Sequence, residues 1–287
     1  MKRNTLIAGA LVLTVVASAC GSSKTTTKAA DAGGAAMTMG DCTITGKANS
    51  IKIKPVVKDT LTIQTSLPAP GWFVGTEANA IKGGYEYCMA AEIAHRAGLS
   101  KVVVTSQDFG QIVAGTTKDF DVALAEISIT DKRKQVVDFS VPYFASDIGV
   151  LVKKDVKVAG TADLKKLKIG VQADTTGADF ATKNISPDAK VFPDAATLMS
   201  AVDSGAIDAA MTDTSIVQEQ EKKSAGAEKV VGQYKTGESY GALYPKGSAN
   251  KTEIDKAITA MISEKVFNSL ATKWLSGDPS AVPFFTV

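Results

Sequence analysis

The stretch Asp119–Arg133, DFDVALAEISITDKR, decides the fold, and it continues three residues later as Val137–Phe144, VDFSVPYF. Its mainly apolar run Phe120–Leu124 predicts a buried strand. Thr130 then follows as a good N-cap for a short helix. Arg133 falls in the first turn of that helix, where free backbone N–H groups and the helix dipole favour an anion. The stretch therefore predicts a strand, a loop and a helix N-terminus that together receive an anionic group.

Short apolar runs alternate with amphipathic stretches on both sides of this segment. Such alternation is typical of strands joined by helical crossovers, so we expect an α/β fold. The expected strands are Thr60–Thr65, Lys101–Val104, Phe120–Leu124, Ile169–Val171 and Ile207–Met211. The expected helices are Tyr85–Ala97, Gln111–Gly115, Gly177–Asn184, Leu198–Gly205 and Thr252–Lys273, the last with a break near Ser263.

Two extended runs separate these sets of elements, Gly149–Lys154 and Tyr240–Tyr244. Two crossings of the chain imply a first lobe that is discontinuous in sequence. We expect lobe 1 to comprise 41–147 and 241–287 and lobe 2 to comprise 148–240, with the last helix packing back on lobe 1.

The N-terminus predicts the compartment. Basic residues precede the apolar run Leu6–Val16, which is too short to cross about 30 Å of hydrocarbon, so 1–20 is expected to be a secretory signal peptide. Cys20 follows small residues, as in a bacterial lipobox, and acylation there would anchor the protein to the outer face of the cell membrane. Ordinary cleavage near Ala19 is the alternative. Residues 21–40 are rich in Ser, Thr, Lys, Ala and Gly and predict a flexible tether.

Composition excludes several classes of function. The formal charge of +2 is too small and too evenly mixed to indicate nucleic-acid binding, and 45% apolar residues suffice for a sizeable core. His95 is the single histidine, and the sequence has no Cys/His spacing for zinc and no glycine-rich phosphate loop. We therefore expect no metal, no cofactor and no catalytic chemistry.

The chain contains three cysteines. With Cys20 assigned to lipid, Cys42 and Cys88 remain. Outside the cytosol two such thiols tend to form a disulfide, which would attach the N-terminal segment to a later helix. Two buried free thiols are the alternative.

The segment 119–144 closely resembles the core of the polar amino acid-binding proteins, the glutamine-, histidine- and lysine/arginine/ornithine-binding proteins that serve ABC importers, and the similarity extends from about Thr60 to Gly277. This resemblance implies a periplasmic-binding-protein-like type II fold, two α/β lobes joined by two crossover strands. It also implies a monomer that captures an amino acid between its lobes and delivers it to an ABC-transporter permease.

The resemblance assigns the two ends of the amino acid to opposite lobes. Arg133 would bind the α-carboxylate with its bidentate fork, aided by Ser128, and Asp213 would hold the α-ammonium. The residues alone leave two alternatives open. Arg133 would then be an exposed first-turn arginine, and Asp213 a plain N-cap for a helix over Thr214–Lys223.

Other residues align with the family's pocket. Thr176, with Asp179 three residues later, has a capping-box pattern, and its backbone N–H or hydroxyl would meet the carboxylate from lobe 2. Gln172, in the same loop, would line the pocket opposite Glu126 and make it polar. Asp174 stands in this loop where relatives commonly have glycine. Phe109 would stack on the ligand side chain, with core packing as its alternative.

The side-chain pocket departs from the family. Ser66 replaces an acid that reads the ligand in several relatives, and Trp72 aligns only loosely with a second aromatic. Glu126 replaces a small residue, and it would pair with Arg133, join Asp213 at the ammonium, or reach a polar side chain. These residues favour a polar or cationic amino acid. Cyclohexadienyl dehydratases share the fold, and in that alternative Glu126 would be a general acid.

Overall fold

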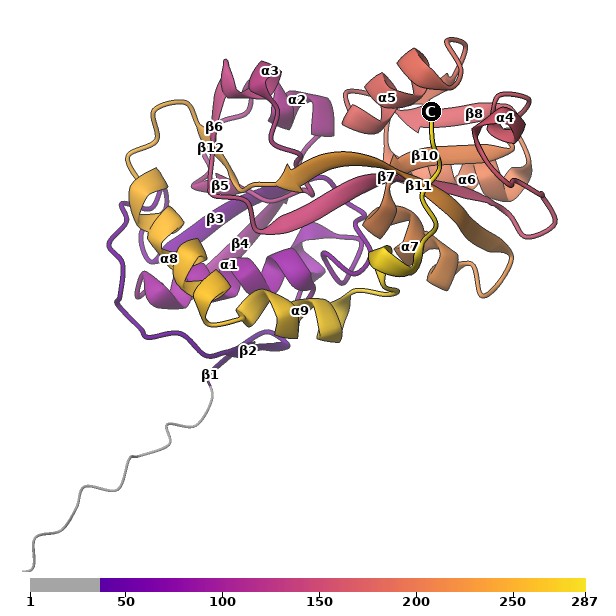
Figure 1. Cartoon of the computed structure of the whole chain (residues 1–287). Helices are drawn as coiled ribbons and strands as arrows, with labels where there is room; N and C mark the ends of the chain where they lie inside the picture. The colour runs from indigo at the N-terminus through magenta and orange to yellow at the C-terminus, as the bar shows by residue number, and fades with distance from the viewer. Residues whose placement is uncertain (1–36) are drawn as a thin grey trace, which may run out of the picture. The chain divides into compact units, whose positions relative to one another are not determined.

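The computed structural model describes residues 37–287, in which two five-stranded mixed sheets each form the centre of one lobe (Figure 1). The predicted signal peptide (1–20), most of the predicted tether (21–40) and the predicted lipidation of Cys20 lie outside these residues. Within them, no helix is long and apolar enough to cross a membrane. The two sheets and their helices confirm the α/β prediction.

The sheet of lobe 1 has the strand order β4-β3-β5-β12-β6, in which β3 is parallel to β4 and β5 and β12 is antiparallel to β5 and β6. Parallel neighbours require crossover connections, which contain α1 and α2, and these bring the carboxyl ends of β3 and β5 to one edge. The elements are β3 (Thr60–Thr65), η1 (Ala78–Ala80), α1 (Tyr85–Arg96), β4 (Lys101–Ser106), α2 (Phe109–Val113), β5 (Val122–Ala123), α3 (Asp131–Lys134), β6 (Val137–Phe139), β12 (Leu243–Pro245), α8 (Lys251–Ser263) and α9 (Val266–Trp274).

The sheet of lobe 2 has the order β11-β7-β10-β8-β9. Here β8 is parallel to β9 and β10, so the carboxyl ends of β8 and β10 also meet at one edge, while β7 is antiparallel to β10 and β11. The elements are β7 (Phe144–Lys153), α4 (Thr161–Leu164), β8 (Ile169–Gln172), α5 (Thr176–Asn184), β9 (Lys190–Phe192), α6 (Ala195–Ser204), β10 (Ala209–Asp213), α7 (Thr214–Lys223), β11 (Glu228–Tyr240) and η2 (Pro279–Ala281).

The long strands β7 and β11 pair antiparallel along the crossing between the lobes (Figure 1). Phe144 pairs with Tyr240 and both pack in the core of lobe 1, whereas Ile148 pairs with Tyr234 and both pack in a core of lobe 2. The register shifts between these two places. The second crossing is made by β11, which ends at Tyr240, and therefore lies earlier in the chain than the run predicted at 240–244. The prediction missed β11 because polar residues interrupt its apolar pattern.

The N-terminal segment is attached to α1 by the disulfide Cys42–Cys88, as predicted, with a Cα–Cα distance of 5.3 Å. The predicted tether extends too far: Met37–Met39 forms β1, which pairs with β2 (Cys42–Ile44). The disulfide and a hydrogen bond from the Asp41 amide to the Lys82 carbonyl hold this hairpin in place.

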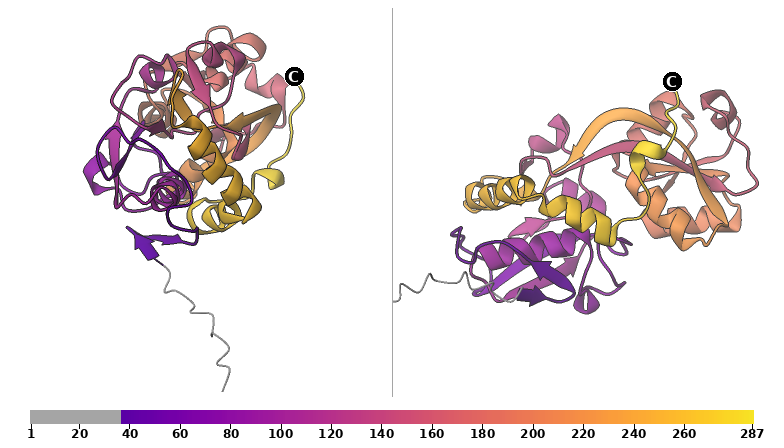
Figure 2. Two further views of the ribbon diagram at one scale, coloured as in Figure 1. Left: turned by 90° about the vertical axis from the view of Figure 1, so that its left-hand side faces the viewer. Right: turned by 60° about the horizontal axis from the view of Figure 1, so that its bottom comes forward.

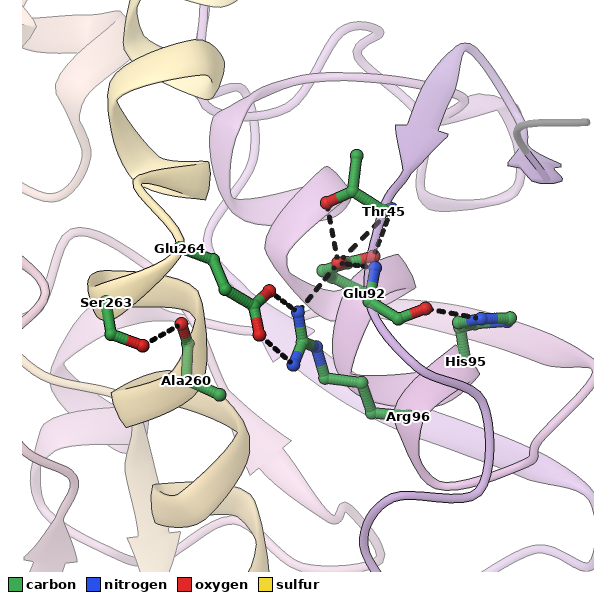
Figure 3. A network of polar contacts seen from close by, with 8 residues as sticks. Thr45, Glu92, His95, Arg96, Ala260, Ser263 and Glu264 are labelled. Carbon is green, nitrogen blue, oxygen red and sulfur yellow. Dashed lines mark hydrogen bonds and ion pairs between the residues drawn. The ribbon is translucent and has the colours of Figure 1, made fainter. Parts of the chain in front are cut away.

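A buried polar network fastens the same segment to α1 and to the break between α8 and α9 (Figure 3). Arg96 Nη2 donates to Glu92 Oε1 at 3.1 Å, and its guanidinium also binds Glu264. Glu92 in turn accepts the Gly46 amide at 2.7 Å. The network satisfies charges that would be costly if buried alone.

The C-terminal residues lie on lobe 2, which corrects the prediction that all of 241–287 belongs to lobe 1 (Figure 2). The backbone N–H of Gln233 in β11 donates to the Pro283 carbonyl, and the backbone carbonyl of Gln233 accepts from the Phe285 N–H. Phe285 also packs in the core with Tyr234. Because β11 is at the edge of its sheet, the backbone groups on its outer side have no partner strand, and the last residues of the chain pair with those of Gln233.

We predict that replacing both Cys42 and Cys88 by serine lowers the free energy of unfolding by about 2–4 kcal/mol, because the crosslink closes a long loop in the unfolded chain. The midpoint of thermal unfolding should fall by about 5–15 °C. Wild-type protein in reductant should fall equally, and the double variant should not respond to reductant. Equal midpoints for all four samples would contradict the disulfide.

Candidate ligand-binding site

A cavity of about 570 Å³, its open mouth included, lies between the facing edges of the two sheets. Eight of the nine residues predicted to contact ligand line it, and only Trp72 does not. The eight are Ser66, Phe109, Glu126, Ser128, Arg133, Gln172, Thr176 and Asp213. They follow β3, β5, β8 and β10 or occupy the short helices beside those strands, because parallel strands end at a common edge.

Arg133 is buried within the first turn of α3, with 7% of its surface exposed, so the alternative of a solvent-exposed arginine is wrong. The predicted N-cap is confirmed, since the Thr130 hydroxyl accepts from the Arg133 amide at 3.2 Å. Arg133 Nη1 donates to the Ser128 carbonyl at 2.8 Å, and Arg133 Nη2 donates to the Asp174 carbonyl of lobe 2 at 2.9 Å. The guanidinium therefore connects the two lobes across the cavity.

Asp213 ends β10 opposite this guanidinium and is buried. It occupies the N-cap position of α7, yet its carboxylate makes no capping hydrogen bond and instead accepts from the Tyr240 hydroxyl at 2.6 Å. Burial raises the pKa of Asp213 to about 7, with the Tyr240 hydrogen bond acting in the opposite direction. The carboxylate is thus free of the helix end and available to a cation.

Glu126 lies at the start of the loop after β5 with φ +50°. Its amide donates to Glu86 Oε1 at 3.0 Å, and its carboxyl group shares a side-chain hydrogen bond with that of Glu86. No ion pair joins Glu126 to Arg133 among residues 37–287. Burial, and then the charge of Glu86, raise the pKa of Glu126 well above its ordinary value.

Glu86 is a residue that sequence reasoning did not assign to the site. It is fully buried in the first turn of α1, where it accepts from the Tyr143 hydroxyl as well as from the Glu126 amide. Burial raises the pKa of Glu86 too. An acid in an otherwise apolar, buried helix start was the available signal.

The loop after β8 differs from the predicted capping box. Thr175, not Thr176, is the N-cap of α5, and its hydroxyl accepts from the Ala178 amide at 3.0 Å. The Thr176 side chain is therefore not engaged in capping. Asp174 adopts φ +60°, the left-handed conformation that explains why glycine is common here and that Asp tolerates better than most residues.

Trp72 packs inside lobe 1 instead of lining this cavity. Its ring lies edge-on to Tyr85, Phe144 and Tyr240, with centroid distances of 4.9, 4.9 and 5.5 Å. It lines a second cavity next to the first. Phe109 lines the ligand cavity and stacks below the Arg133 guanidinium at 5.4 Å.

The charges around the cavity are unbalanced. Three carboxyl groups, on Glu126, Asp194 and Asp213, line it together with one guanidinium, that of Arg133, and Glu86 contacts Glu126 from behind. Such a site has one anion receptor and an excess of acceptors for a cation. It suits a molecule that carries a carboxylate and at least one positive charge.

Comparison with known proteins identifies the family. Residues 61–277 match the family model of the bacterial extracellular solute-binding proteins, family 3. The chain belongs to this family. Family 3 thus accounts for both lobes and both crossing strands.

Relatives of this chain are named for different amino acids. The chain is 27% identical over 199 residues to the L-cystine-binding protein TcyJ of Escherichia coli, covering 68% of this chain and 75% of the relative. It is 32% identical to the glutamine-binding protein GlnH of Bacillus subtilis, covering 56% and 60%. Both are described as binding proteins.

Solved structures extend the likeness across both lobes. The arginine-, lysine-, histidine-binding protein ArtJ of Geobacillus stearothermophilus superposes with a TM-score of 0.66 at 28% identity, covering 75% of this chain and 94% of ArtJ. An ancestral arginine-binding protein bound to glutamine gives a TM-score of 0.68 at 30% identity, covering 76% and 98%. These neighbours confirm the type II periplasmic-binding-protein fold.

We predict that Asp213→Asn stabilises the ligand-free protein near neutral pH. Folding raises the pKa of Asp213, so below about pH 4 the carboxyl is protonated in both states and does not lower the free energy of unfolding. Between pH 4 and 7 the carboxyl ionises in the unfolded chain but not in the folded protein, and the free energy of unfolding falls as pH rises. The gain of the variant over wild type, measured by chemical denaturation, should rise from about 1 kcal/mol at pH 4.5 to about 4 kcal/mol at pH 7.5. Asp188→Asn, which removes an exposed carboxylate of the same lobe, is the control and should show no such gain. A pH-independent difference for Asp213→Asn would contradict the assignment.

Proposed function

We propose that the protein is the extracytoplasmic, lipid-anchored binding component of an ABC importer and captures a polar or cationic amino acid between its lobes. One observation carries this proposal: Arg133 and Asp213 reach the same cavity from opposite lobes. A guanidinium receives an α-carboxylate with paired hydrogen bonds, and a buried carboxylate receives an α-ammonium. Family membership and relatives that bind amino acids support it.

The proposed mechanism is closure of the lobes about β7 and β11. A ligand that touches both lobes stabilises the closed state by its greater affinity for that state, and the closed form is what the permease recognises. The register shift between Tyr234 and Glu238 gives the crossing a natural place to bend. In the structure Arg133 already reaches the Asp174 carbonyl across the cavity, so the lobes lie close enough for one amino acid to contact both.

The excess of acids supports a cationic or polar side chain. Glu126 lines the cavity and is paired with Glu86, and an ammonium, guanidinium or amide N–H on the ligand would be attracted to these two acids. Ligand cations would also favour ionised Asp213, so affinity should strengthen as pH rises through about 7.

We predict that a saturating amino acid ligand raises the midpoint of thermal unfolding of a soluble form that lacks residues 1–20 and keeps strand β1. At a hundredfold excess over Kd the gain is about 2.7 kcal/mol, or roughly 5–10 °C. Arg133→Ala and Asp213→Ala should each abolish the shift. Lys134→Ala removes an exposed cation of the same helix that lines no part of the cavity, and it should retain the shift. No shift with any amino acid would sink the proposal.

A second function is favoured by one observation, the raised pKa of Glu126, which suits a general acid. An ancestral amino acid-binding protein described as a precursor of cyclohexadienyl dehydratase superposes with a TM-score of 0.66 at 27% identity. Incubation with prephenate separates the two functions. Consumption of prephenate that depends on Glu126 would establish the enzyme. If the prephenate concentration stays constant, the enzymatic function is rejected and the binding function is retained.

The lipid anchor is a further part of the proposal. In cells fed an alkyne-labelled fatty acid, we expect the full chain to take up label and to pellet with membranes. Cys20→Ser should take up no label and leave the pellet, while Ser22→Ala should behave as wild type. Equal labelling of Cys20→Ser would reject acylation at Cys20.

A further inference from the structure

A second cavity adjoins the ligand cavity and continues it. Its volume is about 640 Å³ including its open mouth, and it shares four lining residues with the first cavity, Pro68, Glu126, Ala195 and Ile216. We call it the annex. Beyond the shared wall its lining includes Trp72, Met199, Ser200, Asp203, Glu219 and Lys223.

The annex extends along two helices of lobe 2. On α6 the lining runs from Ala195 at the shared wall to Asp203, eight residues further, and on α7 from Ile216 to Lys223, seven residues further. At 1.5 Å per residue these paths measure about 12 and 10 Å. The annex therefore leads about 10 Å away from Arg133 and Asp213, which lie in the first cavity.

The lining changes character along this path. Near the first cavity the walls are Trp72, Met199 and Ile216, of which Trp72 is 1% and Met199 7% exposed. At the far end Asp203 and Lys223 are exposed, and neither forms an ion pair with another residue of the described chain. The annex thus offers an apolar middle and a far end with one acid, Asp203, which also shares a side-chain hydrogen bond with Glu228, and one lysine, Lys223.

Glu126 lies where the two cavities meet and lines both of them. Its carboxyl group forms a side-chain hydrogen bond with that of Glu86, whose Oε1 also accepts from the Glu126 amide. A ligand that extends from the first cavity into the annex therefore passes this pair of acids.

We propose that the solute is an elongated, two-headed amino acid, whose side chain passes Glu126 into the annex and ends in a second charged group near Asp203 and Lys223. This inference rests on the proposed function, because the first head is the zwitterion held by Arg133 and Asp213. The apolar middle suits methylene or thioether atoms. The far anion and cation suit an ammonium and a carboxylate respectively.

The test is calorimetric titration with a series of ligands that share one head. Glutamine, ornithine and arginine have one amino acid head, and cystathionine, diaminopimelate and cystine have two. We expect at least one two-headed ligand to bind ten times more tightly than every single-headed ligand, since each methylene buried in the annex is worth about fourfold. Asp203→Asn should reduce that preference several-fold.

A blocking variant separates the annex from the first cavity. Ser200→Trp places a large ring in the annex from an exposed position and should lower the ratio of two-headed to single-headed affinity at least tenfold. Thr197→Trp adds the same ring to an exposed position of α6 that lines neither cavity, and should keep the ratio.

The outcomes distinguish this inference from the proposed function. Binding of single-headed amino acids that depends on Arg133, with no gain from a second head and no effect of Ser200→Trp on the ratio, overturns the annex alone. No binding of any amino acid overturns both. A two-headed preference that Ser200→Trp removes and Thr197→Trp keeps establishes the annex as the side-chain site.

Discussion

Two antiparallel strands, β7 and β11, carry the chain between the sheets, and they also position the site. Tyr240, at the lobe 1 end of β11, packs against Phe144 and donates its hydroxyl to Asp213 at the end of β10. A change in the angle between the lobes therefore acts directly on the hydrogen bond of the acid that faces the ligand. The same residue belongs to the core, the hinge and the site, so packing, closure and binding are coupled through it.

The site stores an electrostatic imbalance that a ligand would relieve. Glu86, Glu126 and Asp213 cannot all ionise at low cost in a buried space with one guanidinium, and burial raises their pKa values. Arg133 uses two of the five N–H groups of its guanidinium on backbone carbonyls, one from each lobe, which leaves donors for a carboxylate. A zwitterionic or cationic solute supplies the missing charge, and its binding is then linked to proton release.

Family membership and the shape of the cavity answer different questions. Relatives at similar identity are described as binding cystine, glutamine or arginine, so the shared architecture explains how an amino acid head is held but not which side chain is chosen. In this chain the side-chain end is bounded by Glu126 and opens toward α6 and α7. The walls at this end come from the two helices α6 and α7 and not from the sheets.

The sequence by itself determined what depends on near neighbours in the chain. Apolar alternation predicted the main strands, and Thr130 predicted the helix that carries Arg133. Alignment with the resembling family, over stretches spread from Ser66 to Asp213, predicted eight residues that meet in one cavity. Only the tertiary structure decided that Glu86 lies behind Glu126 and that Trp72 turns into the core. It also decided that the last residues lie on lobe 2. These depend on which distant segments share a buried space, because burial, ionisation and packing are properties of the assembled neighbours and not of the local pattern.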